Sequence, residues 1–475
     1  MNQKFKISMY YLIIQIMEKL TVTVLVLLLV LSVTIAGCTI FGKKKELKPF
    51  VSEVVHPEWS KNSVLYEVNV RQYTPEGTFN AFAEHLPRLK ALGIDVLWFM
   101  PTYPIGITNK KGELGSYYSV RDYLSVNPEF GTLDDFKALL NKAHEMGMHV
   151  ILDWVPNHTS WDNKLTIDHP DWYEKDSKGK FIPPRGTDWT DVIQLDWSNP
   201  ELQNYMIEAL KFWVNMGADG FRIDHPNNST KEFWQRARTE LTKIKPVLLI
   251  GEIEEPTYYM EKGFDMNYSW ELYHLTVNIA QSKDSVNKLV KYYNRQWNIY
   301  PNNAYRLQFL TNHDQNTWEG TIDTLMGPAQ RPLAALIFTA QGVPLIYSGQ
   351  EACLNKRIKF FVRDTIKWDT CSMTGFYRNL ISLKKQNKAI WNGDSGGPMV
   401  KITTGKDKNI FAFYREKEES RVVVLLNLSN KNVAIKSLPG NISGEYNDYF
   451  GGSKIALPLS DSLRFRAWDF KVFVK

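Results

Sequence analysis

Polar side chains that can transfer protons or carry charge follow several short apolar segments in this chain of 475 residues. A single aspartate at the end of a strand is more often a helix cap or an ion-pair partner. Here four carboxylates, two histidines, one arginine and one asparagine occupy such positions, and neighbouring parallel strands would bring them to one rim. Such a convergence is typical of a catalytic site. The residues are Asp153, Asn157, His158, Arg222, Asp224, Glu252, His313 and Asp314.

Eight strand-like segments carry or precede these residues, and their apolar character is continuous, as in parallel strands covered on both faces. Helical segments separate them. One places Phe136, Leu139 and Ala143 on one stripe, and another begins with the cap Asn199–Pro200. Eight strand–helix repeats predict a (β/α)8 barrel with its reactive groups at the carboxyl ends of the strands. The strand segments are Val64–Val70, Val96–Met100, Val150–Asp153, Gly220–Asp224, Val247–Glu252, Phe264–Tyr268, Arg306–Thr311 and Val343–Tyr347.

The expected fold is therefore an α/β chain with a (β/α)8 TIM barrel over residues 59–390. The connection after the third strand is long and irregular, so residues 159–196 are predicted to form an inserted excursion over the rim. The helical pattern stops near Ala389, and residues 391–475 are predicted to form a C-terminal antiparallel β-domain. Its expected strands are Ile410–Phe413, Val422–Leu426, Val433–Ile435 and Phe465–Val474.

An apolar leader precedes the barrel. Thr21–Gly37 carries no charge, follows Lys19 and ends in small residues before Cys38, which is the pattern of a secretory signal. Its end resembles a bacterial lipobox, which implies that Cys38 is lipidated; an uncleaved signal anchor is the alternative. Residues 1–38 are thus predicted to be a lipoprotein signal peptide, with Met17 as an alternative start, and residues 39–58 a linker. An exported protein held on a membrane by its N-terminal lipid is expected.

Composition limits the other partners. The chain is 44% hydrophobic and 23% charged, which excludes disorder over its whole length. Its net charge of +6 is small and evenly spread, so no nucleic-acid partner is expected. The two cysteines beyond the leader, Cys353 and Cys371, either pair or remain two buried thiols, and no Cys/His cluster has the spacing of a zinc site.

The motifs at the predicted strand ends resemble the α-amylase family of glycoside hydrolases. They follow the family's order and read DWVPNH, GFRID, GE after an apolar strand, and NHD. Supporting matches are Gly115–Tyr123, Phe130–Thr132 and Gly342–Glu351, so the resemblance covers about residues 59–390. Each motif alone is a weak signal, but the ordered set is specific.

Carried across residue by residue, the resemblance implies a retaining α-glucan hydrolase. Asp224 would be the nucleophile, Glu252 the general acid/base and Asp314 the third carboxylate, which stabilises the transition state. Four further residues would assist them. Tyr118 would stack on the sugar at the cleavage point, and His158 and His313 would bond hydroxyls of that sugar. Arg222 would keep the nucleophile ionised.

Cleavage with retention requires two carboxyl groups ~5–5.5 Å apart, one to attack the anomeric carbon and one to protonate the leaving oxygen. Adjacent strands are ~4.8 Å apart, which is the right scale for that separation. Arg222 beside Asp224 favours a carboxylate there, whereas the apolar run Val247–Ile250 before Glu252 favours a neutral acid. The two carboxyl groups are thus expected to differ in protonation at rest.

The chain departs from the family pattern at Asn227 and Asn228, where many members have Lys-His. No cofactor is implied as required, but calcium could be held by Asn157 together with Asp188 or Asp191, because calcium favours oxygen donors.

The substrate and the reaction leave alternatives open. The stretch from Glu254 to Trp270 is similar to exported bacterial α-amylase-like proteins, which favours α-1,4-glucans such as starch or maltooligosaccharides. An α-glucan transglycosylase shares the same intermediate, and a non-catalytic glucan-binding relative is the third interpretation. Several tryptophans on predicted rim loops either stack on sugars or pack in the core. They are Trp154, Trp161, Trp172, Trp189 and Trp318.

Overall fold

The computed structural model describes residues 52–255, 259–369, 371–457 and 462–475. The predicted leader, Cys38 and most of the predicted linker therefore lie outside the described residues. Within the described ranges, no helix has the length and apolarity needed to cross a membrane.

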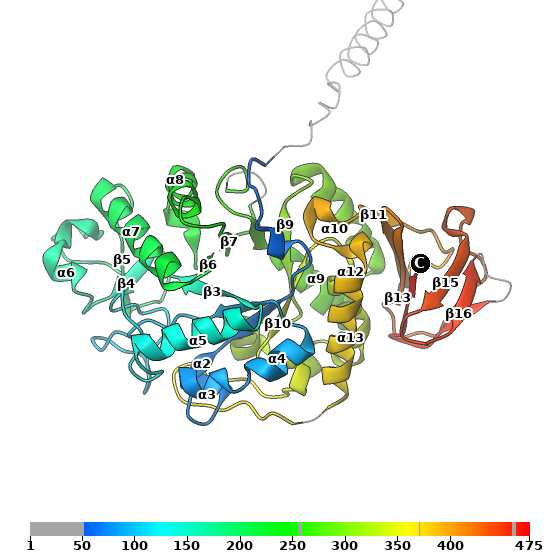
Figure 1. Cartoon of the computed structure of the whole chain (residues 1–475), viewed down its shortest axis with the longest axis horizontal. Helices are drawn as coiled ribbons and strands as arrows, with labels where there is room; N and C mark the ends of the chain where they lie inside the picture. The colour runs from blue at the N-terminus through cyan, green and yellow to red at the C-terminus, as the bar shows by residue number, and fades with distance from the viewer. Residues whose placement is uncertain (1–51, 256–258, 370, 458–461) are drawn as a thin grey trace, which may run out of the picture. The chain divides into compact units, whose positions relative to one another are not determined.

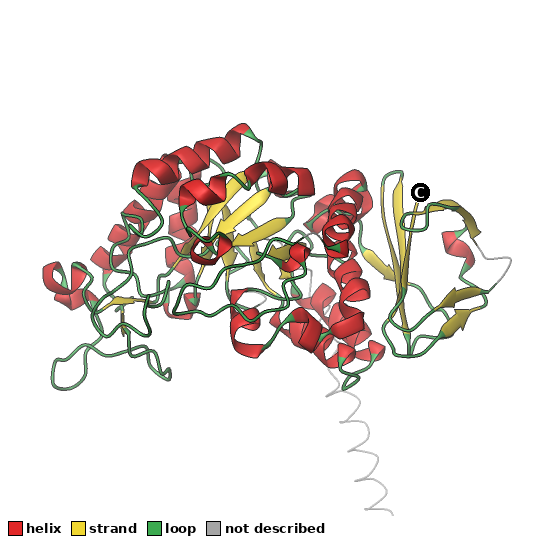
Figure 2. Ribbon diagram, turned by 90° about the horizontal axis from the view of Figure 1, so that it is seen from below, coloured by secondary structure: helices red, strands yellow, loops and turns green. Residues whose placement is uncertain are grey.

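Eight parallel strands close into a barrel in the order β1-β10-β9-β8-β7-β6-β3-β2, and helices surround them (Figures 1 and 2). All eight strand segments expected from the sequence are confirmed, as is the TIM-barrel fold. Every strand is buried along almost its whole length, which explains its continuous apolar character. The strands are β1 (Leu65–Val68), β2 (Val96–Phe99), β3 (His149–Trp154), β6 (Gly220–Ile223), β7 (Leu248–Gly251), β8 (Met266–Tyr268), β9 (Tyr305–Gln308) and β10 (Val343–Tyr347).

The helices follow the caps that the sequence provides. α5 begins with a capping box in which Thr132 and Asp135 bond each other's backbone N–H groups. At α7 the side chain of Asn199 accepts from two backbone N–H groups, which confirms the predicted cap. The helices are α2 (Val70–Tyr73), α3 (Phe79–Ala83), α4 (Leu86–Leu92), α5 (Leu133–Glu145), α6 (Leu165–Asp168), α7 (Pro200–Met216), α8 (Lys231–Thr242), α9 (Trp270–Ala280), α10 (Val286–Ile299), α11 (Ile322–Leu325), α12 (Gln330–Thr339) and α13 (Ser372–Gln386).

The register of three neighbouring strands places the polar residues side by side. Asp153 on β3 lies opposite Arg222 on β6. Beyond the strand ends, the N–H of Glu252 still bonds the carbonyl of Ile223, so Asp224 and Glu252 follow adjacent strands at matching heights. Gly220 opens β6 with φ of 156°, and a Cβ there would lie 2.0 Å from the carbonyl oxygen of Leu248. A glycine is therefore required for β6 to approach β7.

The long connection between β3 and α7 is anchored by a small antiparallel pair. β4 (His158–Ser160) pairs with β5 (Val192–Gln194), and α6 lies between them in the chain. This pair holds the predicted excursion, residues 159–196, against the end of β3.

The C-terminal region forms an antiparallel sheet of order β11-β12-β13-β18-β15-β16 with a separate β14-β17 pair. The prediction of one strand over Phe465–Val474 is wrong, because a turn with Trp468 at φ of 56° divides it into β17 and β18. The strands are β11 (Met399–Lys401), β12 (Ile410–Lys417), β13 (Ser420–Asn427), β14 (Val433–Ile435), β15 (Gly444–Asp448), β16 (Lys454–Leu457), β17 (Leu463–Phe465) and β18 (Phe470–Val474).

Cys353 and Cys371 form a disulfide, which decides between the two alternatives left open by the sequence. The bond closes the loop after β10, and this loop carries Phe360 and Phe361.

Asp219 fixes the base of β6. Its carboxylate accepts hydrogen bonds from the Val150 N–H at 2.8 Å, from Lys245 at 2.8 Å and from His144 at 2.7 Å. Burial raises the pKa of Asp219, but the hydrogen bonds from His144 and Lys245, together with the nearby His149 ring, outweigh burial and hold the pKa well below its ordinary value. The carboxylate thus joins β3 to β6 beneath the polar rim.

We predict that Asp219→Asn lowers the free energy of unfolding by about 3 kcal/mol at pH 7, because it removes one partner of a buried ion pair. A depressed folded-state pKa stabilises the protein above the unfolded value of ~3.9, and this contribution is lost as the pH falls below about 5. Denaturant titrations of the wild type and the variant should therefore converge towards pH 3. Asp134→Asn, an exposed matched control, should change stability little. A difference that is the same at pH 3 and pH 7 would contradict this assignment.

Candidate active site

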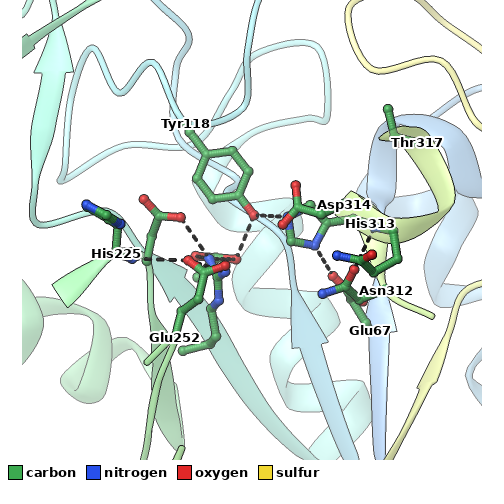
Figure 3. A network of polar contacts seen from close by, with 12 residues as sticks. Glu67, Tyr118, His225, Glu252, Asn312, His313, Asp314 and Thr317 are labelled. Atoms are coloured by element: carbon green, nitrogen blue, oxygen red, sulfur yellow. Dashed lines mark hydrogen bonds and ion pairs between the residues drawn. The ribbon is translucent and has the colours of Figure 1, made fainter. Parts of the chain in front are cut away.

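A cavity of about 820 Å³ lies at the carboxyl ends of the barrel strands. Six of the seven residues expected at the catalytic and sugar-binding positions line it, and Arg222 lies beneath it with no exposed surface. In Figure 3 the Tyr118 hydroxyl points towards His313 and Asp314, and Glu252 lies on the side of His225. The six residues are Tyr118, His158, Asp224, Glu252, His313 and Asp314.

The guanidinium of Arg222 contacts three carboxyl groups at once. Its Nη1 donates to Asp153 Oδ1 at 2.9 Å and to Asp224 Oδ1 at 3.1 Å, and its Nη2 lies 2.8 Å from Glu252 Oε2. Its Nε donates to the hydroxyl of Tyr268 at 3.1 Å. The sequence predicted the contact between Arg222 and Asp224. The structure shows that Arg222 also contacts Asp153 on β3 and Glu252 after β7.

The carboxyl groups around Arg222 cannot all be ionised. Burial raises the pKa of Glu252 to about 8; Arg222 lowers it, and the neighbouring charges of Asp224 and Asp314 raise it. Burial also raises the pKa of Asp153. Glu252 is therefore protonated at neutral pH, as the apolar run before it predicted. Its Oε2 accepts from the His225 N–H at 3.1 Å.

His313 connects a second group of residues. Its Nδ1 lies 2.5 Å from Glu67 Oε1, and its Nε2 lies 2.8 Å from the Tyr118 hydroxyl and 3.3 Å from Asp314 Oδ2. Burial lowers the pKa of His313, but Asp314 and Glu67 outweigh it and raise the pKa to about 9. Glu67 was not identified from the sequence. Its only signal there is a single carboxylate within an apolar strand, and that strand is buried on both faces.

His158 is held as a neutral ring. Its Nε2 lies 3.1 Å from the Tyr118 carbonyl oxygen, which can only accept, so Nε2 carries the proton. Its Nδ1 then accepts from the Asn157 amide at 3.1 Å. Burial lowers its pKa, in agreement with this tautomer. The ring lines the cavity next to Trp189, with ring centroids 5.5 Å apart.

Aromatic side chains form the cavity walls. Of the predicted tryptophans, Trp189 and Trp318 line the cavity, and Trp318 is 52% exposed. Trp154 and Trp172 are buried in the core instead, and Trp161 is partly buried with its indole N–H bonded to a backbone carbonyl. Three further wall residues were not identified from the sequence. Phe360 and Phe361 lie in the loop after β10, which has no periodic pattern, and Trp270 is the first residue of α9.

The residues expected to hold calcium do not fit that ion. Asn157 Oδ1 accepts hydrogen bonds from the Gln194 amide at 3.1 Å and from the Asn228 amide. Asp191 Oδ1 lies 3.3 Å from the ammonium group of Lys111, which also donates to the carbonyl of Asp188. Calcium takes 6–8 oxygen ligands. Here protein N–H donors already occupy Asn157 Oδ1, Asp191 Oδ1 and the backbone carbonyl of Asp188.

We therefore predict that removal of calcium leaves the protein unchanged. Dialysis against a chelator should leave the thermal unfolding midpoint and the activity as they were, and millimolar calcium should not raise the midpoint, because an ion that binds only the folded state must stabilise it. Lys111→Met should lower the midpoint, whereas Lys110→Met is the control at the neighbouring lysine. A rise of several degrees on addition of calcium would contradict the assignment.

Comparisons with known proteins agree with this geometry. The family model described as the alpha amylase catalytic domain matches residues 54–193 and 187–397. Alpha-amylase 3 of Dictyoglomus thermophilum is 27% identical over 446 residues, covering 78% of this chain and 85% of its own length.

Two solved structures extend the likeness. A maltogenic alpha-amylase from Thermotoga neapolitana is 28% identical with a TM-score of 0.80, covering 88% of this chain and 100% of its own. An alpha-amylase from Lactobacillus plantarum is 29% identical with a TM-score of 0.77, covering 88% and 99%. The match to the family model spans well over half of the chain, including the whole barrel with its polar rim. The chain is a member of the alpha-amylase family of glycoside hydrolases.

Proposed function

We propose that this protein hydrolyses α-1,4-glucosidic bonds in starch-like glucans or maltooligosaccharides with retention of configuration. One observation carries the proposal: Asp224 and Glu252 follow adjacent strands at matching heights and contact the same guanidinium. They differ in protonation, because Glu252 keeps its proton at neutral pH. A carboxylate and a carboxylic acid on adjacent strands, close enough to contact one guanidinium, are the kind of pair that retaining glycosidases require.

The reaction follows from this asymmetry. Asp224 attacks the anomeric carbon while Glu252 gives its proton to the leaving glycosidic oxygen, so that bond breaks and a glycosyl ester forms on Asp224. The Glu252 carboxylate then takes a proton from water as the water attacks the same carbon. The ester bond breaks, the sugar leaves with its original configuration, and both carboxyl groups return to their starting states.

Asp314 and the residues around it support the transition state. Its carboxylate lies beside His313 Nε2 at the cavity surface, where it faces the charge that develops on the sugar ring. Tyr118 and His158 line the same part of the cavity, where an aromatic face and a ring edge would bound the sugar. Arg222 takes no part in substrate contact and acts on the carboxyl groups from below.

The proposed substrate rests on the cavity and on the relatives. A volume of about 820 Å³ with aromatic walls suits a chain of several sugar units, whose apolar faces pack on aromatic rings. The names of the similar proteins from Dictyoglomus, Thermotoga and Lactobacillus are those of alpha-amylases.

The leader supports a proposal about location. We propose that the protein is exported and that a lipid on Cys38 holds it on a bacterial membrane, because an uncharged apolar run ends in small residues directly before that cysteine. Incorporation of labelled palmitate into the wild type, and its loss in Cys38→Ser, is the corresponding test.

The products formed from a panel of sugars test the proposed reaction. We expect the purified chain to release short maltooligosaccharides from soluble starch and maltoheptaose, with cyclodextrin, pullulan and trehalose as comparisons. NMR should show the α-anomer first, because two inversions retain the configuration. Products longer than the substrate would favour a transglycosylase. A folded protein that binds these sugars without turnover would be a binding relative and would contradict the proposal.

Substitution of the two carboxyl groups should separate their roles. We predict that Asp224→Asn and Glu252→Gln each lower kcat on starch by about 10³-fold or more, because each acts only in the chemical step. α-Maltosyl fluoride needs no acid to leave, so Glu252→Gln should still release fluoride from it, whereas Asp224→Asn should not.

Glu240→Gln is the control, since it neutralises a partly exposed carboxylate on α8 that pairs with Lys243 and does not line the cavity. All three variants should keep the wild-type unfolding midpoint within a few degrees. An active Asp224→Asn, or fluoride release that is equal in both variants, would refute the assignment of roles.

A further inference from the structure

We propose that Glu67 is a positioning residue of the active site, which keeps both ring nitrogens of His313 as hydrogen donors so that Nε2 donates to the Tyr118 hydroxyl and carries positive charge beside Asp314. This inference rests on the proposed function. It concerns a residue that neither reacts nor lines the cavity.

Glu67 lies on β1 with no exposed surface, and its side chain points towards His313 (Figure 3). Its Oε1 is 2.5 Å from His313 Nδ1. Its Oε2 has no hydrogen-bond partner among the described residues. A buried carboxylate requires a compensating donor, and the imidazole is the charged group placed to provide it. The contact therefore fixes a proton on Nδ1.

The other ring nitrogen faces two oxygen atoms. Nε2 is 2.8 Å from the Tyr118 hydroxyl and 3.3 Å from Asp314 Oδ2. The tyrosine hydroxyl donates its own hydrogen to Asp153 Oδ2 at 3.2 Å, and a carboxylate can only accept. Nε2 must then donate as well. His313 is thereby a cation whose Nδ1 contacts the buried Glu67 and whose Nε2 faces the cavity residues Tyr118 and Asp314.

The charged groups around His313 support this state. Asp314 and Glu67 raise its pKa, while burial and Arg222 lower it. Asp153 and Glu252 also face it across the floor, and the ring edge of Trp98 is 6.1 Å away, centroid to centroid. Asp314 is partly exposed to the cavity, whereas Glu67 is sealed within the barrel. Glu67 thus provides the fixed negative charge that keeps His313 protonated at neutral pH.

The bridge has a mechanical consequence. The rings of Tyr118 and His313 are stacked with centroids 5.6 Å apart and an angle of 22°. A rotation or deprotonation of His313 would release both the tyrosine ring and the third carboxylate. Glu67 would therefore influence kcat more than KM, because Asp314 acts when charge develops on the sugar.

The test is Glu67→Gln, followed by kcat/KM against pH. The wild type should lose activity as the pH rises through the raised pKa values of Glu252 and His313. In the variant the alkaline limb should move at least one pH unit towards acid, so that kcat/KM at pH 8 falls about tenfold while the value at pH 5.5 stays near wild type. Loss of the cation would raise the pKa of Glu252, so Glu252 cannot cause an acid shift.

Glu351→Gln is the matched control. Glu351 is equally buried, and it bonds the Tyr66 hydroxyl at 2.8 Å and Arg88 at 2.7 Å instead of any cavity residue. Its loss should lower stability without moving the alkaline limb. Glu67→Asp, which keeps the charge, should restore the limb in part. An unshifted limb in Glu67→Gln, or a uniform loss at all pH values like that of Glu351→Gln, would overturn the inference.

A second readout does not require activity. In protein labelled at histidine, the imidazole resonance that is absent from His313→Gln belongs to His313. Its titration should occur above pH 8 in the wild type and at least one unit lower in Glu67→Gln. Equal titration in both would overturn the positioning role even if no glucan is cleaved, and a shift without turnover would leave the role intact while refuting the proposed reaction.

Discussion

The buried guanidinium of Arg222 is the interaction on which the rest of the site depends. It has no exposed surface, yet it contacts carboxyl groups at the carboxyl ends of three neighbouring barrel strands, β3, β6 and β7. Without it, Asp153, Asp224 and Glu252 would be buried together with nothing to offset their repulsion, at a cost of several kcal/mol for each ionised group. A planar, always-charged fork is the side chain that can serve three acceptors at fixed angles. The barrel closure supplies the strands, and Arg222 makes their polar ends compatible with burial.

The charge balance around this centre explains how two chemically similar groups acquire different roles. Around the floor of the cavity, two cationic side chains lie near five carboxyl groups. Some of the carboxyl groups must therefore retain a proton. Glu252 does so because its surroundings are apolar and it shares Arg222 with two competitors. His313 is the second cation, and its Nε2 lies beside the carboxylate of Asp314. The acid–base asymmetry is thus a property of the whole cluster. The seven groups are Arg222, His313, Glu67, Asp153, Asp224, Glu252 and Asp314.

Local patterns were sufficient for the barrel and for most of the rim. Continuous apolar runs marked all eight strands, and the residues at their ends converge because parallel strands share one carboxyl edge. Contacts between distant segments carried no such pattern. Glu67 and His313 are separated by 246 positions, and Phe360 lies in a loop whose path depends on a disulfide. The turn at Trp468 was missed for a related reason, since a run of strand-forming residues does not reveal a single left-handed φ angle.

Asn228, where the chain departs from the family pattern, is one reason why the predicted calcium site does not fit the ion. Asn228 stands where many family members have a histidine, and its side-chain amide donates to Asn157 Oδ1. Gln194 donates to the same oxygen from β5, and Lys111 neutralises Asp191 from another loop. Together they bind the excursion to the ends of β3 and β6 with groups of the chain itself. His158 follows Asn157 directly and accepts a hydrogen bond from its amide, so this network also sets the tautomer of a ring that lines the cavity. The excursion therefore helps to form the site. A change in Gln194 would alter the hydrogen bonds of Asn157, which orient the His158 ring at the cavity.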